Sequence, residues 1–128
     1  MKSILTVLGA IAIACWLATV ARGAPSAEGD ADAGAELYGS VCKGCHGVSI
    51  APTLRGVIGR RIASVESFPA YTPALQAKGD LTWTPELLDK FLQAPGEFAP
   101  GTAMTQVLSD AQARADLIAY LATLPAPR

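Results

Sequence analysis

The pentapeptide Cys42-Lys43-Gly44-Cys45-His46 constrains this chain more than any other feature. It contains the only histidine of the 128 residues and two of the three cysteines. Two thiols three positions apart lie on one turn, where they can form thioether bonds to the two vinyl groups of a haem, and the adjacent imidazole then becomes an axial ligand of the iron. The pattern therefore predicts one covalently attached haem c, held by Cys42, Cys45 and His46.

Three other interpretations of the two cysteines are weaker. A zinc site needs four ligands, and no cysteine or histidine follows His46. A dithiol redox site follows a strand in an α/β sheet, whereas this motif closes a predicted helix in a chain without strand patterns. A disulfide across two intervening residues would stabilise the fold little and would leave His46 without a role.

Met104 is the candidate for the second axial ligand of the iron. It is the only methionine besides Met1, and it lies in segment 95–104, whose two prolines and two glycines exclude a long helix. A methionine that fills a gap in the core is the alternative interpretation. Because a methionine thioether is an established ligand of haem iron, the sequence favours His46 and Met104 as the axial pair.

The first 24 residues have the pattern of a cleaved export signal. A positive charge precedes an uncharged, mostly apolar stretch over residues 4–21, and small residues follow it. This length is close to the minimum for a membrane span, about 17 residues, so an uncleaved anchor is the first alternative. Lipid modification of Cys15 is the second, although the apolar stretch continues beyond it. We expect export to the periplasm and a mature start near Ala24 or Pro25.

The rest of the chain forms one small acidic domain. Residues 25–31 are small, polar and turn-forming, so we interpret them as a flexible lead-in to a domain over residues 32–128. Without residues 1–24 the chain has eight basic and eleven acidic residues, a net charge of −3. Such a chain has no positive surplus with which to neutralise phosphates, so nucleic-acid binding is not expected.

The patterns along this domain predict an all-α fold with long loops. Capping residues and apolar spacing predict helices from near Asp32 to the pentapeptide, over 72–79, over 84–95, and from a capping box at Ser109 up to Pro125. The stretch 47–71 is mostly loop, and a loop this long is unusual unless something other than a backbone ladder holds it. A central ligand would do so.

Separated signals beyond the pentapeptide resemble the class I c-type cytochromes, a family of mitochondrial and bacterial periplasmic proteins. The resemblance covers nearly all of residues 32–124. The matching positions are Gly34, Tyr38, Pro52, Leu54, Gly56, Gly59, Arg60, Tyr71, Trp83, Pro100, Gly101, Thr102, Met104 and 114–121. It implies about four to five short helices wrapped with long loops around one haem, and N- and C-terminal helices that pack across each other.

The resemblance also implies a set of haem-pocket residues. These are Pro52, Arg60, Tyr71, Trp83 and Thr102. The Pro52 carbonyl would accept a hydrogen bond from the far nitrogen of His46 and fix its orientation. Arg60, Tyr71 and Trp83 would gather around the buried haem propionates, whose charge needs polar partners away from water.

The chain departs from the mitochondrial members near the expected methionine ligand. Phe91 stands where many members have a tyrosine, and Ala103 stands where they have a lysine beside the methionine. Gly96 and Glu97 fall in a neighbouring lysine-rich stretch. The basic ring that docks onto acidic partners is therefore not carried over, and partners are expected to be recognised by other patches or by apolar contact.

The resemblance implies a monomeric, mono-haem carrier of single electrons, Fe(III)/Fe(II), and not an enzyme. Its partners would be membrane or periplasmic redox proteins of a respiratory chain, namely a reductase, an oxidase or a dehydrogenase. Membrane contact is expected only if the N-terminal segment is retained. The alternatives are a dedicated haem subunit of a periplasmic dehydrogenase, and a gas sensor or weak peroxidase with an open sixth site.

Overall fold

The structure is a computed structural model and describes residues 28–128. The predicted export signal, Cys15 and the first part of the predicted lead-in lie outside the described residues. The helices are α1 (Ala31–Leu37), the π-helical η1 (Tyr38–Cys42), α2 (Lys43–His46), α3 (Pro73–Gln76), α4 (Pro85–Gln93), α5 (Pro95–Phe98) and α6 (Ala111–Thr123). Within this part of the chain the only β structure is one isolated bridge between Arg61 and Thr82. The all-α prediction is confirmed.

One continuous helical run leads into the pentapeptide, because α1, η1 and α2 follow one another without a break. Its start is capped by Asp30, whose carboxylate accepts hydrogen bonds from the N–H groups of Asp32 (2.9 Å) and Ala33 (3.3 Å). The predicted cap position, Asp32, was therefore wrong, and the observed cap lies two residues earlier in the chain. Asp32 lies in the first turn instead, where its negative charge favours the helix N-terminus.

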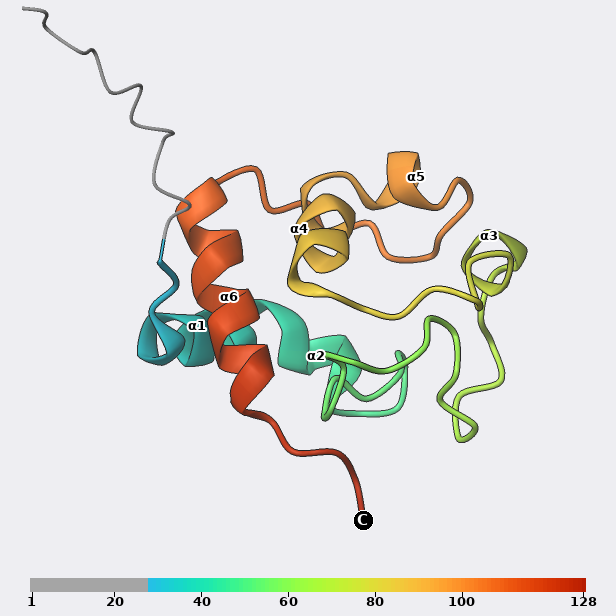
Figure 1. The fold of residues 1–128 in the computed structure, drawn as a ribbon, viewed down its shortest axis with the longest axis horizontal. Helices are drawn as coiled ribbons and strands as arrows, with labels where there is room; N and C mark the ends of the chain where they lie inside the picture. The colour runs from blue at the N-terminus through green and yellow to red at the C-terminus, as the bar shows by residue number, and fades with distance from the viewer. Residues whose placement is uncertain (1–27) are drawn as a thin grey trace, which may run out of the picture.

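The first and last helices cross as predicted, and Figure 1 shows α6 passing across α1. Gly34 is buried at the crossing, where a Cβ atom would overlap the main-chain carbonyl of Asp116. Beside it, the rings of Tyr38 and Tyr120 lie with their centroids 5.3 Å apart. The absence of a side chain at residue 34 therefore sets how closely the two helices approach.

The described end of the predicted lead-in, residues 28–30, lies on α6. The Gln112 side chain donates to the Glu28 carbonyl (3.1 Å), and the Asp30 N–H donates to the Asp116 carboxylate (2.8 Å). The N-cap of α6 is Asp110, which accepts from the Ala113 N–H at 2.7 Å. The capping box expected at Ser109 is thus displaced by one residue, because the longer Asp110 carboxylate makes the capping bond.

Proline starts two helices in the second half of the chain. Thr84 caps α4 as predicted, accepting from the Leu87 N–H at 3.2 Å, and Pro85 is at the first helical position. Pro95 was expected only to end this helix and begin an irregular segment over 95–104. It also begins the four-residue α5, because proline at the first helical position needs no N–H. The segment 99–110, here called the strap, is non-helical and carries Met104.

The apolar core lies between α4, α6 and the loops. Its buried members are Cys42, Val57, Ile62, Trp83, Leu88, Phe91, Leu92, Leu117 and Leu121. The loop after the pentapeptide reaches this core, and three main-chain hydrogen bonds hold it to residues 81–83: Gly59 N to Trp83 O (2.9 Å), Trp83 N to Arg60 O (2.8 Å) and Ile62 N to Leu81 O (2.9 Å). These long-range bonds give the loop an anchor that no local pattern predicts. Within residues 28–128 no helix is long and apolar enough to cross a membrane.

Ser49 lies in the left-handed region of backbone conformation, with φ of 65°. A residue with a Cβ atom pays about 1 to 2 kcal/mol for this conformation. We expect Ser49→Gly to raise the free energy of unfolding by about 0.5 kcal/mol, since part of the gain is offset by the greater freedom of unfolded glycine. As a control, Ala77→Gly, at a position with φ of −62°, is expected to lower the free energy of unfolding by about 0.5 kcal/mol. Urea denaturation measures both changes. A destabilised Ser49→Gly chain would contradict the assignment of strain.

Candidate haem site

The two cysteines of the pentapeptide lie on one helical run but differ in exposure. Cys42, at the end of η1, is 8% exposed and belongs to the core, whereas Cys45 in α2 is exposed. Burial raises the pKa of the Cys42 thiol. Both thiols are free, so the structure contains no disulfide between them. Between residues 28 and 128 there is also no group of three histidine, cysteine or acidic side chains placed to hold a metal ion such as zinc.

The imidazole of His46 is oriented by a main-chain carbonyl. Its Nδ1 atom lies 2.6 Å from the Pro52 oxygen, as the resemblance implied. A carbonyl oxygen only accepts, so Nδ1 carries the proton and donates, and in the neutral ring Nε2 keeps its lone pair. Burial lowers the pKa of His46, as does the charge of Arg60, against the opposing hydrogen bond to Pro52. The ring is therefore held in the neutral tautomer that ligates a metal through Nε2.

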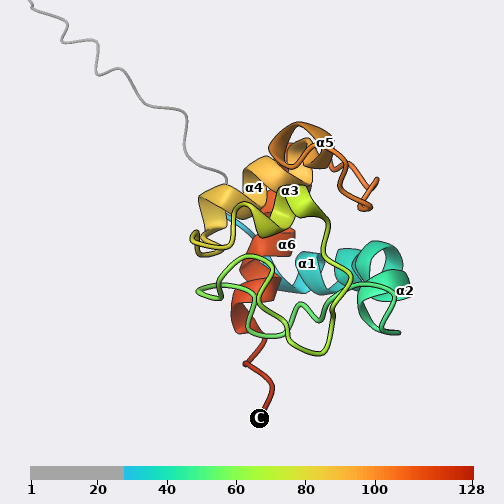
Figure 2. The ribbon, with the colours of Figure 1, turned by 90° about the vertical axis from the view of Figure 1, so that its right-hand side faces the viewer.

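Met104 lies half-buried in the strap and packs against the same apolar core as Cys42. Two local contacts shape its surroundings: the Thr102 hydroxyl accepts from the Met104 N–H at 3.4 Å, and the Thr102 N–H donates to the Ala99 carbonyl at 3.0 Å. Further along, the Leu108 N–H donates to the Leu92 carbonyl of α4 at 2.9 Å. In both ribbon views the strap runs above α2 (Figures 1 and 2).

The end of the strap is fixed by a buried arginine. Arg114 of α6 is 6% exposed, and its Nε donates to the Asp89 carboxylate of α4 at 2.6 Å. Its Nη1 donates to the carbonyls of Leu108 (2.8 Å) and Ser109 (2.9 Å). One guanidinium thus joins α4, α6 and the strap. Sequence analysis missed this role, because the partners of Arg114 are set by the fold and not by local spacing.

Arg60 lies near the Tyr71 phenol and is joined to Trp83 through the main chain. Arg60 is half-buried and donates to the carbonyls of Thr53 (2.7 Å) and Arg55 (2.8 Å), and its own carbonyl accepts from the Trp83 N–H. Burial raises the pKa of the Tyr71 phenol, while the neighbouring charge of Arg60 opposes the shift. Burial likewise lowers the pKa of Arg60. This cluster is electrostatically suited to an anion, because a carboxylate beside Arg60 would offset the cost of its burial.

The Trp83 ring is enclosed by aromatic side chains. It is 8% exposed, lies stacked on Phe98 with ring centroids 5.7 Å apart, and contacts Phe91 at 5.3 Å. Phe91 is one of the departures from the family pattern noted above, and here it fills the core with a ring that has no hydroxyl. Lys78 completes the group, since its Nζ atom lies 4.8 Å from the centroid of the Phe98 ring.

Thr72 is a site residue that sequence analysis missed. It precedes α3 at the N-cap position, but its side chain makes no capping hydrogen bond. Its Oγ1 atom is buried and has no hydrogen-bond partner within the described residues. An unpaired buried hydroxyl is costly, so this atom, next to Tyr71, is placed to bind a polar group that the chain itself does not supply. In the sequence it is indistinguishable from an ordinary capping threonine.

These residues fit a haem. Cys42 and Cys45 supply two thiols on one helical run, His46 supplies a neutral imidazole, and Arg60, Tyr71 and Thr72 supply polar groups for carboxylates. The apolar side chains packed around the buried core are mostly half-buried, which suits a large flat apolar group. They are Leu37, Tyr38, Val41, Leu54, Ile58, Ala63, Leu75, Leu87, Phe98, Met104, Leu108, Ile118 and Leu124.

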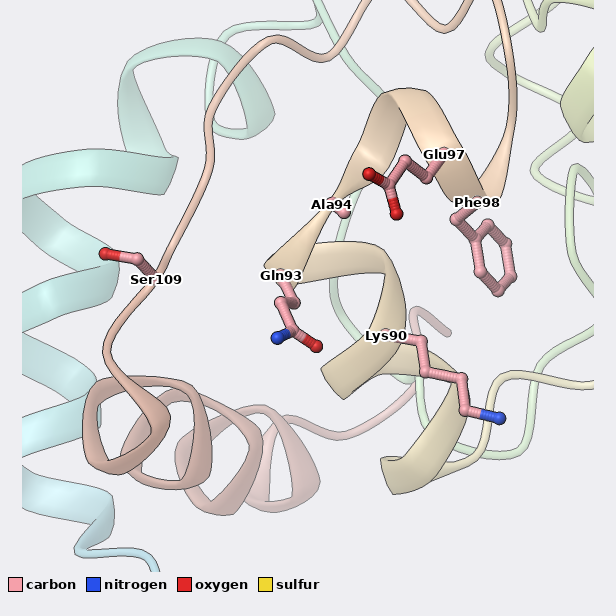
Figure 3. A pocket seen from close by; sticks show the side chains of 6 residues that line it. All are labelled: Lys90, Gln93, Ala94, Glu97, Phe98 and Ser109. Atoms are coloured by element: carbon pink, nitrogen blue, oxygen red, sulfur yellow. The ribbon is translucent and has the colours of Figure 1, made fainter.

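Two surface hollows adjoin these residues. One, of about 620 Å³, is lined by Lys90, Gln93, Ala94, Glu97, Phe98 and Ser109. Figure 3 shows that the side chains of Lys90 and Ser109 point away from each other, so its polar groups do not converge on one ligand. The other, of about 220 Å³, adjoins His46, Pro52 and Phe68 and belongs to the histidine side of the site.

Comparison with known proteins gives consistent matches. The family model for cytochrome c matches residues 31–125. A cytochrome c-type cyt cy of Rhodobacter capsulatus is 46% identical over 102 residues, which cover 76% of this chain and 50% of that protein. Cytochrome c2 of Rhodopila globiformis is 37% identical over 102 residues, which cover 75% of this chain and 94% of that protein. The chain thus spans half the length of the first relative and nearly all of the second.

A solved structure of a cytochrome c also matches this chain. Cytochrome cH from Methylobacterium extorquens superimposes with a TM-score of 0.63 at 38% identity, covering 74% of this chain and 99% of that chain. The family match spans the pentapeptide, the strap and both crossing helices. The chain therefore belongs to the cytochrome c family, whose members carry one covalently attached haem c, and it is a mono-haem electron-transfer protein rather than an enzyme.

Proposed function

We propose that Cys42 and Cys45 hold the haem by thioether bonds and that His46 and Met104 are its axial ligands. When bound, the haem supplies reversible one-electron chemistry between Fe(III) and Fe(II). The single observation that carries this assignment is the hydrogen bond of 2.6 Å between His46 Nδ1 and the Pro52 carbonyl. It fixes both the tautomer and the direction of Nε2, and it increases the basicity of the ligating nitrogen.

Met104, held in the strap, would supply the second ligand of the iron. The thioether sulfur is uncharged, and the residue packs against the apolar core. A neutral sulfur ligand and an apolar surround both favour the form of the iron with less positive charge, so we expect a positive reduction potential. The Thr102 hydroxyl, which accepts from the Met104 N–H, positions this part of the strap.

The polar groups around Tyr71 receive the haem carboxylates in this proposal. Arg60 supplies positive charge, Tyr71 a phenol, and Thr72 the buried hydroxyl without a partner. Trp83, whose main chain is hydrogen-bonded to that of Arg60, would add its indole N–H as a further donor. Because buried carboxylates need hydrogen-bond donors, these residues offset the cost of taking them out of water.

We further propose that the protein works in the periplasm as a carrier between respiratory redox proteins, among them a reductase, an oxidase or a dehydrogenase. The pattern of residues 1–24 supports export, and contact with a membrane follows only if that segment is retained.

Absorption spectra and protein mass test the ligand assignment. We expect the purified protein to carry the mass of one haem, and its oxidised form to show the weak sulfur-to-iron band at the red end of the visible spectrum. Met104→Ala should lose this band and keep the haem, whereas Thr105→Ala, an exposed neighbour in the same strap, should keep both. Replacing Cys42 and Cys45 together with alanine should abolish the covalently bound mass.

The outcomes separate the parts of the proposal. Absence of the red band in the wild-type protein, or its persistence in Met104→Ala, would refute methionine ligation. A protein without haem mass after expression with haem-attachment machinery would refute the thioether assignment. The same mass measurement reports the N-terminus, and a chain that still contains residues 1–24 would contradict signal cleavage.

A further inference from the structure

Residues 52–60, here called the Pro52 loop, carry two parts of the proposed haem site. The first carbonyl of the loop, at Pro52, accepts the hydrogen bond that orients the imidazole of the pentapeptide, and the last residue is Arg60. The Arg60 guanidinium folds back onto the carbonyls of Thr53 (2.7 Å) and Arg55 (2.8 Å). The loop is thus hydrogen-bonded internally, so a displacement at one position is transmitted to the others.

Few main-chain hydrogen bonds join the Pro52 loop to the rest of the described chain. At its far end, the bonds to Trp83 described above hold it. Between residues 52 and 58, Gly56 has the only main-chain N–H that donates to another part of the chain described here, and its acceptor is the Leu124 carbonyl at 3.1 Å. The Val57 side chain is buried in the core, which draws the loop inward without fixing its direction.

Gly56 meets the segment after α6 at close range. Its φ of 64° lies in the left-handed region, and a Cβ atom there would lie 2.7 Å from the Cα atom of Ala126 and 2.9 Å from its Cβ atom. Leu124 is the C-cap of α6, donates its own N–H to the Leu121 carbonyl at 3.2 Å and packs against the core. Residues 124–126 therefore join the end of α6 to the Pro52 loop.

We propose that residues 124–126 position the Pro52 carbonyl against His46, and that the reduction potential of the haem depends on this contact. The inference rests on the proposed function, because it assumes that His46 ligates the iron. Residues 124–126 are positioning residues, since they act on the imidazole through Gly56 and the Pro52 loop.

The direction of the effect follows from the hydrogen bond to the imidazole. The bond between His46 Nδ1 and the Pro52 oxygen is short, at 2.6 Å, so movement of the loop away from the ring weakens it. A weaker bond leaves Nε2 less basic and a poorer electron donor to the iron. Because Fe(III) depends on electron donation more than Fe(II) does, release of the contact should raise the reduction potential.

Paired glycine substitutions in the haem-loaded protein test the contact. Gly56→Ala places a methyl group against Ala126. Gly59→Ala is the matched control, because Gly59 is also in the left-handed region, with φ of 84°, but a Cβ atom there meets no atom within 4 Å. The two variants therefore carry similar backbone strain and differ in their contact with residues 124–126.

Solvent exchange of the His46 Nδ1 proton, followed by NMR in the reduced protein, measures the hydrogen bond directly. The main-chain N–H of Leu117, a buried residue of α6, is the internal reference, because a general loss of stability speeds the exchange of both protons. We expect Gly56→Ala to raise the His46 rate relative to the Leu117 rate by about tenfold, and Gly59→Ala to change this ratio by less than about twofold.

Redox titration gives an independent measurement. At one applied potential, Gly56→Ala should shift the ratio of Fe(II) to Fe(III) by about threefold toward Fe(II), which at about 59 mV per tenfold corresponds to about 28 mV. Gly59→Ala should keep the ratio within about 1.5-fold of the wild type. Ala126→Ile disturbs the contact from the other side at an exposed residue, so it tests the proposal even if Gly56→Ala does not fold, and it should shift the ratio in the same direction.

The possible results separate this proposal from the one on which it rests. Equal exchange ratios in Gly56→Ala and Gly59→Ala, or a reduction potential that neither Gly56→Ala nor Ala126→Ile changes, would overturn the positioning role and leave the axial ligands as assigned. A His46→Ala variant with an unchanged visible spectrum would instead contradict the proposed ligation of the iron.

Discussion

Replacing Arg114 with leucine is expected to lower the free energy of unfolding by about 3 kcal/mol. The substitution leaves the carbonyls of Leu108 and Ser109 without their donor and removes the partner of Asp89. The Asp89 side chain is 42% exposed and can be hydrated, so the loss falls at the lower end of the range for a broken buried pair. Chemical denaturation followed by circular dichroism measures the change.

A second readout distinguishes a general loss of stability from release of the strap. Under conditions in which Arg114→Leu remains folded, we expect a weaker sulfur-to-iron band, because the end of the strap that carries Met104 is no longer held to α4. Asp89→Asn retains a hydrogen-bond acceptor and should cost only about 1 kcal/mol. A leucine variant with unchanged stability and an unchanged band would refute the anchoring role of Arg114.

Gly34→Ala is expected to destabilise the fold by about 3 kcal/mol, which corresponds to a fall in melting temperature of roughly 15 °C for a domain of this size. The new Cβ would overlap the carbonyl of Asp116, a main-chain atom that moves only if α6 moves. The better helix propensity of alanine, worth about 1 kcal/mol, offsets only part of this cost. Thermal unfolding followed by circular dichroism measures the result.

Gly39 provides the matched control for this substitution. It lies in η1 of the same helical run, is exposed, and a Cβ there would meet no atom within 4 Å. Gly39→Ala should therefore raise the stability by about 0.5 to 1 kcal/mol. If both alanine variants changed the melting temperature in the same direction, close packing at Gly34 would not be the cause.

The sequence predicted those helices whose start depends on residues next to one another. Thr84, Pro85 and Glu86 together specify the start of α4, and the structure has the capping bond there. The start of α1 was misplaced because Asp30 and Asp32 are the same residue type, and only the three-dimensional path of the chain decides which carboxylate reaches the N–H groups. The helix α5 was missed because proline both ends one helix and begins another.

The residues of the site likewise fall into two groups: those that local spacing identifies, and those whose role is visible only in the folded chain. Spacing within the pentapeptide singled out Cys42, Cys45 and His46, and the count of methionines singled out Met104. The roles of Arg114 and Thr72 depend instead on what lies beside them after folding: distant main-chain carbonyls in one case, and the lack of any partner in the other. Such relations leave no trace in residue type or spacing.

The pairing of α1 with α6 has a consequence for biosynthesis. Helices of this length are not stable alone in water, so the seven residues of α1 depend on packing against α6, which ends at Thr123. Until that helix is available, the pentapeptide lies in an unstructured chain whose thiols are open to an attachment enzyme. Both thiols are accessible together only while the two helices are apart, because the native fold buries Cys42 and leaves Cys45 exposed.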